Sequence, residues 1–116
     1  MSYCDISAST DFDELMEATY SKNPTIRKKA LKEFCPCHVK KDIEKIWDRI
    51  LEMKTDESPV VRDQVVHSLC DGSPKERETE VIATLEELWN DPDERVRRRV
   101  RKALNAYRRT GNWNVL

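Results

Sequence analysis

The chain has 116 residues, of which 37% are charged and 38% hydrophobic, and its formal net charge is −1. This composition is too apolar for an intrinsically disordered chain, and a content of only two glycines argues against a turn-rich β protein. No apolar run approaches the roughly 20 residues of a membrane-spanning helix, and the N-terminus lacks the pattern of a secretory signal peptide. We therefore expect a cytoplasmic protein that makes no membrane contact and keeps its cysteines reduced.

Apolar periodicity predicts six helices, and the short linkers make consecutive helices antiparallel neighbours. The first ten residues are expected to be disordered. The first helix covers about 11–21 and the third about 38–54. Each of the other four helices begins with a good N-cap residue followed by proline at the first helical position. These pairs are Asn23-Pro24, Ser58-Pro59, Ser73-Pro74 and Asp91-Pro92.

The predicted helix ends also carry signals. The only two glycines, Gly72 and Gly111, each follow a predicted helix, where a left-handed residue is a common terminator. Residues 112–116 form a tail containing Trp113, which we expect to fold back over the open end of the last hairpin, because a terminal repeat needs cover for its apolar face. The alternative is a free C-terminal docking motif.

An apolar-Arg pair recurs every 35 residues, at Ile26-Arg27, Val61-Arg62 and Val96-Arg97. The apolar positions that follow each pair recur at the same interval. A fixed period of this size indicates stacked helical repeats. We therefore predict an all-α fold, an α-solenoid of about three helical hairpins within a single domain at 11–116. The expected repeats are about 11–37, 38–72 and 73–111.

An Asp in the turn precedes the pair with identical spacing at Asp56…Val61-Arg62 and Asp91…Val96-Arg97. This pattern resembles the HEAT repeat, including the short bacterial HEAT-like repeats, over roughly residues 11–110. The resemblance implies a right-handed, armadillo-like superhelix in which turn Asp and second-helix Arg residues hydrogen-bond between neighbouring repeats. It gives a structural role to Asp56, Asp91, Arg27, Arg62 and Arg97. Ser21 stands in the place of the first Asp, which suggests a degenerate N-terminal capping repeat.

In a HEAT-like stack the second helices line the concave surface, so residues between their core positions project there. The aligned positions carry Lys28, Lys29 and Lys32 in the first repeat, Asp63, Gln64 and His67 in the second, and Arg98, Arg99 and Lys102 in the third. The C-terminal end is the basic end of the chain, since residues 91–116 hold eight Arg or Lys and three acids. This pattern suggests a basic stripe that binds an acidic protein, or else a merely solvated face.

Nucleic-acid binding by the same stripe is a further alternative. The near-neutral net charge and the absence of aromatic residues interleaved with the basic ones argue against it. The oligomeric state is open, because a short stack has two exposed ends.

Three cysteines and two histidines could in principle converge on a metal ion. Thiolate and imidazole ligands suit Zn²⁺, but Cys35-Pro-Cys37 is not the usual ligand spacing. The repeat alignment puts His38 at a helix N-cap, His67 on the exposed face and Cys70 at the equivalent of Cys35. A Cys/His metal site is therefore the second alternative, and we expect no metal or other cofactor. No Ser/His/Asp set and no phosphate-binding glycine loop occurs, so we expect a non-catalytic scaffold.

Overall fold

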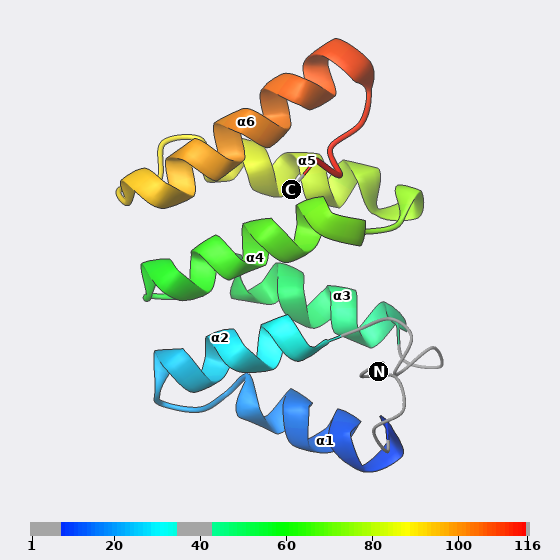
Figure 1. Ribbon diagram of the computed structural model, residues 1–116, viewed down its shortest axis with the longest axis vertical. Helices are drawn as coiled ribbons and strands as arrows, with labels where there is room; N and C mark the ends of the chain where they lie inside the picture. Colours follow the sequence, from blue (N-terminus) through cyan, green and yellow to red (C-terminus); the bar gives the residue numbers. More distant parts are fainter. Residues whose placement is uncertain (1–7, 35–42, 116) are drawn as a thin grey trace.

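The computed structural model describes residues 8–34 and 43–115, which are helical with no strand (Figure 1). The first hairpin consists of α1 (Ala8–Ala18) and α2 (Pro24–Glu33). The second consists of α3 (Ile43–Glu52), extended by the 3₁₀ turn η3 (Met53–Thr55), and α4 (Pro59–Gly72). The third consists of the 3₁₀ turn η4 (Lys75–Arg77), α5 (Glu78–Glu87) and α6 (Glu94–Thr110). The predicted all-α, solenoid-like fold is confirmed.

The hairpins stack along the longest axis of the molecule, in chain order (Figure 1). The second helix of each hairpin forms the more closely packed layer, since α4 contacts α2 on one side and α6 on the other more extensively than α3 contacts α5. We call the exposed side of α2, α4 and α6 the second-helix face. Every second helix therefore presents its exposed positions beside those of the next.

The core follows the 35-residue register. Val61 and Val65 on α4 have no exposed surface, and the same holds for their counterparts Val96 and Val100 on α6. Ala30 on α2 is 2% exposed. Burying one β-branched or aliphatic side chain contributes about 1.5–3 kcal/mol, so the repeated stripe is the main source of stability.

Two helices begin at the predicted cap residue and proline, but only one of them has the predicted capping hydrogen bond. Asn23 caps α2, because its Oδ1 accepts the Thr25 N–H at 2.9 Å while Pro24 takes the first helical position. Ser58 precedes α4 as predicted, but its hydroxyl makes no capping hydrogen bond. Its own N–H instead donates to Asp56 Oδ1 at 2.9 Å, which closes the turn before the helix.

Other predicted helix ends were wrong by a few residues. The cap of α6 is Asp93, whose Oδ1 accepts the N–H groups of Arg95 and Val96, because the Asp91 carboxylate is bound to Arg62. Ser73 does not cap α5; its hydroxyl donates to the Leu69 carbonyl, and the 3₁₀ turn η4 intervenes.

The first helix begins at Ala8, so the predicted disordered segment is helical over 8–10, and residues 1–7 lie outside the described part. Gly111 has the left-handed φ of 78° and ends α6 as predicted. Gly72 is instead the last residue of α4 and has no positive φ, because the extended Ser73 follows it directly as the cap residue.

Candidate interaction surface

An arginine joins the first repeat to the second. Arg27 donates from Nε and Nη2 to the two carboxylate oxygens of Asp56, both at 2.9 Å, and from Nη1 to the Ser21 carbonyl at 2.7 Å. The side chains of Arg27 and Asp56 are only 9% and 11% exposed. The hydrogen bond to Asp56 raises the pKa of Arg27, and burial acts in the opposite direction. The pair is therefore a shielded, charged cross-link between repeats.

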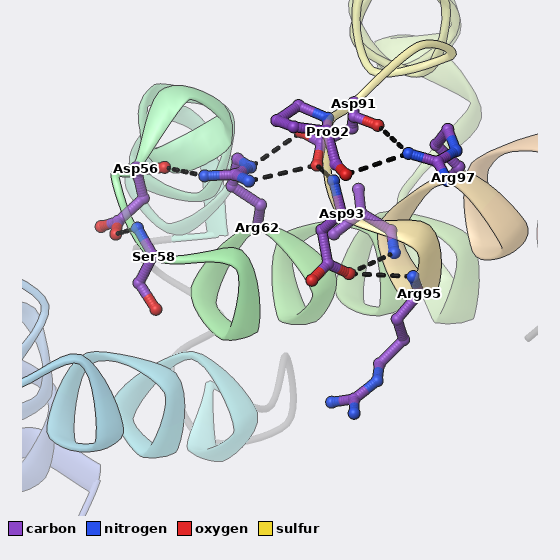
Figure 2. Close-up of polar contacts among 9 residues, drawn as sticks. Asp56, Ser58, Arg62, Asp91, Pro92, Asp93, Arg95 and Arg97 are labelled. Atoms are coloured by element: carbon purple, nitrogen blue, oxygen red, sulfur yellow. Dashed lines mark hydrogen bonds and ion pairs between the residues drawn. The ribbon is translucent and has the colours of Figure 1, made fainter.

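The same arrangement recurs one repeat later (Figure 2). Arg62 donates from Nε to Asp91 Oδ1 at 2.8 Å, from Nη2 to Oδ2 at 3.1 Å, and from Nη1 to the Asp56 carbonyl at 2.7 Å. Two-point contacts of this kind use the planar guanidinium fully. The structure thus brings together Arg27 with Asp56, and Arg62 with Asp91.

Arg97 makes only half of these contacts. Its Nη1 donates to the Asp91 carbonyl at 2.7 Å and to the Pro92 carbonyl at 3.0 Å (Figure 2). No carboxylate from residues 8–34 or 43–115 reaches its Nε or Nη2. Ser21 is the matching feature at the other end of the stack, since its hydroxyl accepts the Asn23 N–H at 3.1 Å just as Asp56 accepts that of Ser58.

The three lysines of α2 remain available on the surface. Lys29 and Lys32 are exposed, Lys28 is half-buried, and none forms an ion pair with the rest of the described chain. We call Lys28, Lys29 and Lys32 the α2 patch. On α6, Arg98 and Lys102 are exposed and form the α6 patch. Arg98 pairs with Glu94 at 3.1 Å one turn earlier on the same helix, where both side chains are well solvated.

Arg99 does not stand free beside the α6 patch. It crosses to α4, where its Nε lies 2.7 Å from Asp63 Oδ1 and its Nη1 lies 3.2 Å from His67 Nδ1. The contact with Asp63 is a close ion pair rather than an aligned hydrogen bond. Asp63, expected on the exposed face, is only 7% exposed as a result. The predicted stripe is therefore divided into the α2 and α6 patches by a neutralised band on α4.

Two further arginines of α6 are held by a tryptophan. Arg101 lies over the Trp89 ring at 4.9 Å and donates to the Trp89 carbonyl at 3.0 Å, while Arg108 lies over the same ring at 5.1 Å. Trp89 is only partly buried. Such cation–π contacts fix cationic side chains on the protein's own surface.

A hollow of about 250 Å³ opens between α2 and α4 beside the α2 patch. Its lining includes the apolar side chains of Leu31, Phe34 and Trp47. Lys32, His67 and the acidic Asp71 also line it. The second-helix face therefore combines basic residues with an apolar recess.

The C-terminal tail is anchored rather than free. Trp113 is 1% exposed, and its indole N–H donates to the Ser73 hydroxyl at 2.7 Å. The Asn114 amide donates to the Ser73 carbonyl at 3.3 Å. The tail thus folds back as predicted, but it returns to the connection between α4 and η4 (Figure 1).

The cysteine and histidine candidates do not assemble in the part of the chain that the structure describes. Cys70 is fully buried, and burial raises the pKa of its thiol to about 12, which disfavours the thiolate that a metal requires. Within the described ranges, no three His, Cys, Asp or Glu side chains could hold a metal ion. Cys35, Cys37 and His38 lie outside those ranges.

Comparison with known protein families gives one match. The model for HEAT repeats matches residues 48–112, more than half of the chain, and this segment contains both Asp-turn and Val-Arg units. Searches of curated proteins and of solved structures found no match. None of the described helices is long and apolar enough to cross a membrane. HEAT repeats generally mediate protein interactions as scaffolds and are typically non-catalytic. This chain belongs to the HEAT-repeat family.

Proposed function

We propose that this protein is a non-catalytic scaffold that binds a negatively charged protein surface through its second-helix face. The observation that carries the proposal is the α2 patch. Three lysines share one face of a ten-residue helix without an acidic partner in the described chain. The α6 patch supplies a second basic point on the same face, two helices away.

The spacing of the two patches sets the distance between the acidic groups that a partner must present. Neighbouring packed helices lie about 8–10 Å apart, so the α2 and α6 patches are separated by about 16–20 Å. A partner must present acidic groups at two places over that span and tolerate the neutral band formed by Asp63, His67 and Arg99. The closer packing of the second-helix layer supports the proposal that this face is the concave one.

The apolar recess favours a protein partner over a nucleic acid. A peptide or protein can place an apolar side chain against the partly buried Phe34 beside the acidic groups that meet Lys32. A phosphate backbone offers only charge. Phosphate contacts would also make affinity fall steeply with salt concentration.

The test begins by isolating a partner from the native host on the immobilised chain. The affinity of the purified partner for the purified chain is then measured. The variant K29E/K32E reverses two exposed charges of the α2 patch and should weaken binding at least about tenfold. The charge-matched control K22E/K75E changes two exposed lysines outside the second-helix face, one before α2 and one in η4, and should bind as the wild type does. Equal losses in the two variants would overturn the proposal.

The α6 patch needs its own variant. R98E/K102E changes residues that make no contact across repeats, whereas a change at Arg99 also strips Asp63 of its counter-ion. Loss of binding in R98E/K102E with an unchanged circular dichroism spectrum would support a two-patch surface. A wild-type affinity for that variant would confine the site to α2.

A further inference from the structure

We propose that the outer edge of the last hairpin, centred on Arg97, is a separate docking site for a carboxylate at the N-terminal turn of a helix in another protein. The site is independent of the second-helix face proposed above. It is identified by comparing Arg97 with Arg27 and Arg62, which occupy the same register position.

The two internal copies show what such an arginine binds. In each, Nη1 is fixed by a carbonyl six residues earlier at 2.7 Å, and this contact orients Nε and Nη2 toward an Asp carboxylate of the next repeat. Arg97 keeps the fixing contact, to the Asp91 carbonyl at the same 2.7 Å, and adds a second to Pro92. Its guanidinium is therefore anchored through the same Nη1 contact as in the two internal copies, and its Nε and Nη2 meet no carboxylate of the described residues.

The partner's carboxylate also has a defined setting. Asp56 and Asp91 each accept the N–H of the residue two positions later, at 2.9 and 3.0 Å, while they bind the arginine. The ligand of this arginine is thus a carboxylate at the turn that precedes a helix. An acidic side chain in the middle of a helix would lack the backbone N–H that the Asp carboxylate accepts in both internal copies.

A second copy of this chain does not supply the ligand in the repeat register. Its N-terminal hairpin carries Ser21 at the position of Asp56 and Asp91, and a hydroxyl cannot form the two-point ionic contact. Charge complementarity therefore points to a different protein with an acidic turn.

The surroundings of Arg97 fit a polar contact rather than one more apolar repeat. Leu31 and Val66, which are 1% and 0% exposed between neighbouring second helices, correspond to Arg101 on α6. Cys70, which is fully buried, corresponds to the exposed Asn105. The outer side of α6 therefore offers arginine and amide groups where the inner repeats offer apolar ones.

The experiment follows the arginine Nε–H signals of the full chain by ¹H–¹⁵N NMR. The probe is the acetylated, amidated peptide Thr-Asp-Glu-Ser-Pro, which reproduces residues 55–59. We expect a saturable shift of the Arg97 signal that is several times larger than the shift of Arg98, the adjacent exposed arginine. The peptide with Asn in place of Asp should bind about tenfold more weakly, because the charged two-point contact is lost.

The variant R97K separates geometry from charge. It keeps the positive charge but loses the planar fork, so the Asp peptide should lose its advantage over the Asn peptide. Equal shifts at Arg97 and Arg98, or equal binding of the two peptides to the wild type, would overturn the proposal. The second-helix variant K29E/K32E should leave the Arg97 response unchanged, which keeps this test apart from that of the scaffold function.

Discussion

Arg62 and Asp91 stand 29 residues apart in the sequence and meet through two hydrogen bonds of 2.8 and 3.1 Å. Their side chains are 12% and 4% exposed, so the pair is shielded from water and salt. Because Arg62 Nη1 also holds the Asp56 carbonyl, one side chain ties together the turns of two successive repeats.

Loss of this pair should be costly. Arg62→Ala leaves the Asp91 carboxylate buried without its counter-ion, and we expect the free energy of unfolding to fall by about 3–5 kcal/mol. Urea unfolding followed by circular dichroism measures the change. The chain supplies a matched control in Arg97→Ala, which removes the same side chain from a position without a carboxylate partner in the described residues. Comparable losses in the two variants would mean that the ion pair itself adds little.

The contact between Arg99 and Asp63 gives a second pair of variants. Arg99→Ala should destabilise the fold by about 1–3 kcal/mol, because Asp63 is 7% exposed and loses its only ion-pair partner among the described residues. Arg98→Ala removes an exposed pair with Glu94 one turn away, and its effect should stay within about 0.5 kcal/mol. Thermal unfolding of both variants against the wild type provides the comparison. A smaller effect for Arg99 than for Arg98 would contradict the assignment of the neutral band.

The repeat explains what could be predicted from the sequence and what could not. Any feature that recurs every 35 residues was accessible, because three aligned copies separate core positions from exposed ones. The apolar stripe around Val65 and Val100 is the clearest case. The period also aligned Arg27, Arg62 and Arg97. Their contacts differ in whether a following Asp is present, and Arg97 in addition donates to the Pro92 carbonyl.

Contacts that occur once carry no such signal. Arg99 reaches Asp63 because only the third repeat carries an arginine at this position, where the second carries Gln64. The α2 lysines form no ion pair with the described chain. Arg49 of α3 binds the Thr19 hydroxyl and carbonyl at 2.8 and 2.9 Å, but its counterpart in the next repeat is Thr84. The start of α6 differs from the prediction for a related reason, because Asp91 could either cap α6 or bind Arg62. Local capping rules do not take account of a partner 29 residues away.

Trp113 should be a major anchor of the last hairpin. Trp113→Ala removes a large side chain that is 1% exposed, so we expect a loss of about 3–5 kcal/mol in the free energy of unfolding. Trp113→Phe keeps most of the apolar contact but loses the indole hydrogen bond to Ser73, and it should lose about 1 kcal/mol. Guanidinium unfolding followed by circular dichroism ranks the variants. A wild-type midpoint for Trp113→Ala would show that the tail is dispensable in solution.

Cys70 should be inert toward thiol reagents in the folded chain. Its thiol is fully buried, and burial raises its pKa from 9.0 to about 12, so the reactive thiolate is suppressed at neutral pH. Iodoacetamide labelling followed by peptide mapping resolves Cys70 from the other cysteines. We expect its labelling to rise with urea in step with global unfolding, and rapid labelling without denaturant would contradict a sealed α4 core.

The raised pKa of the Cys70 thiol implies that stability depends on pH. Because the folded state holds this proton more tightly than the unfolded state, the associated stability is complete below pH 9 and is lost as the pH rises toward 12. Cys70→Ala removes the titrating group but leaves every lysine and tyrosine in place. The stability difference between wild type and Cys70→Ala should therefore shrink as the pH rises above 9. A difference that stays constant over that range would show that the unfolded chain protects the thiol equally well.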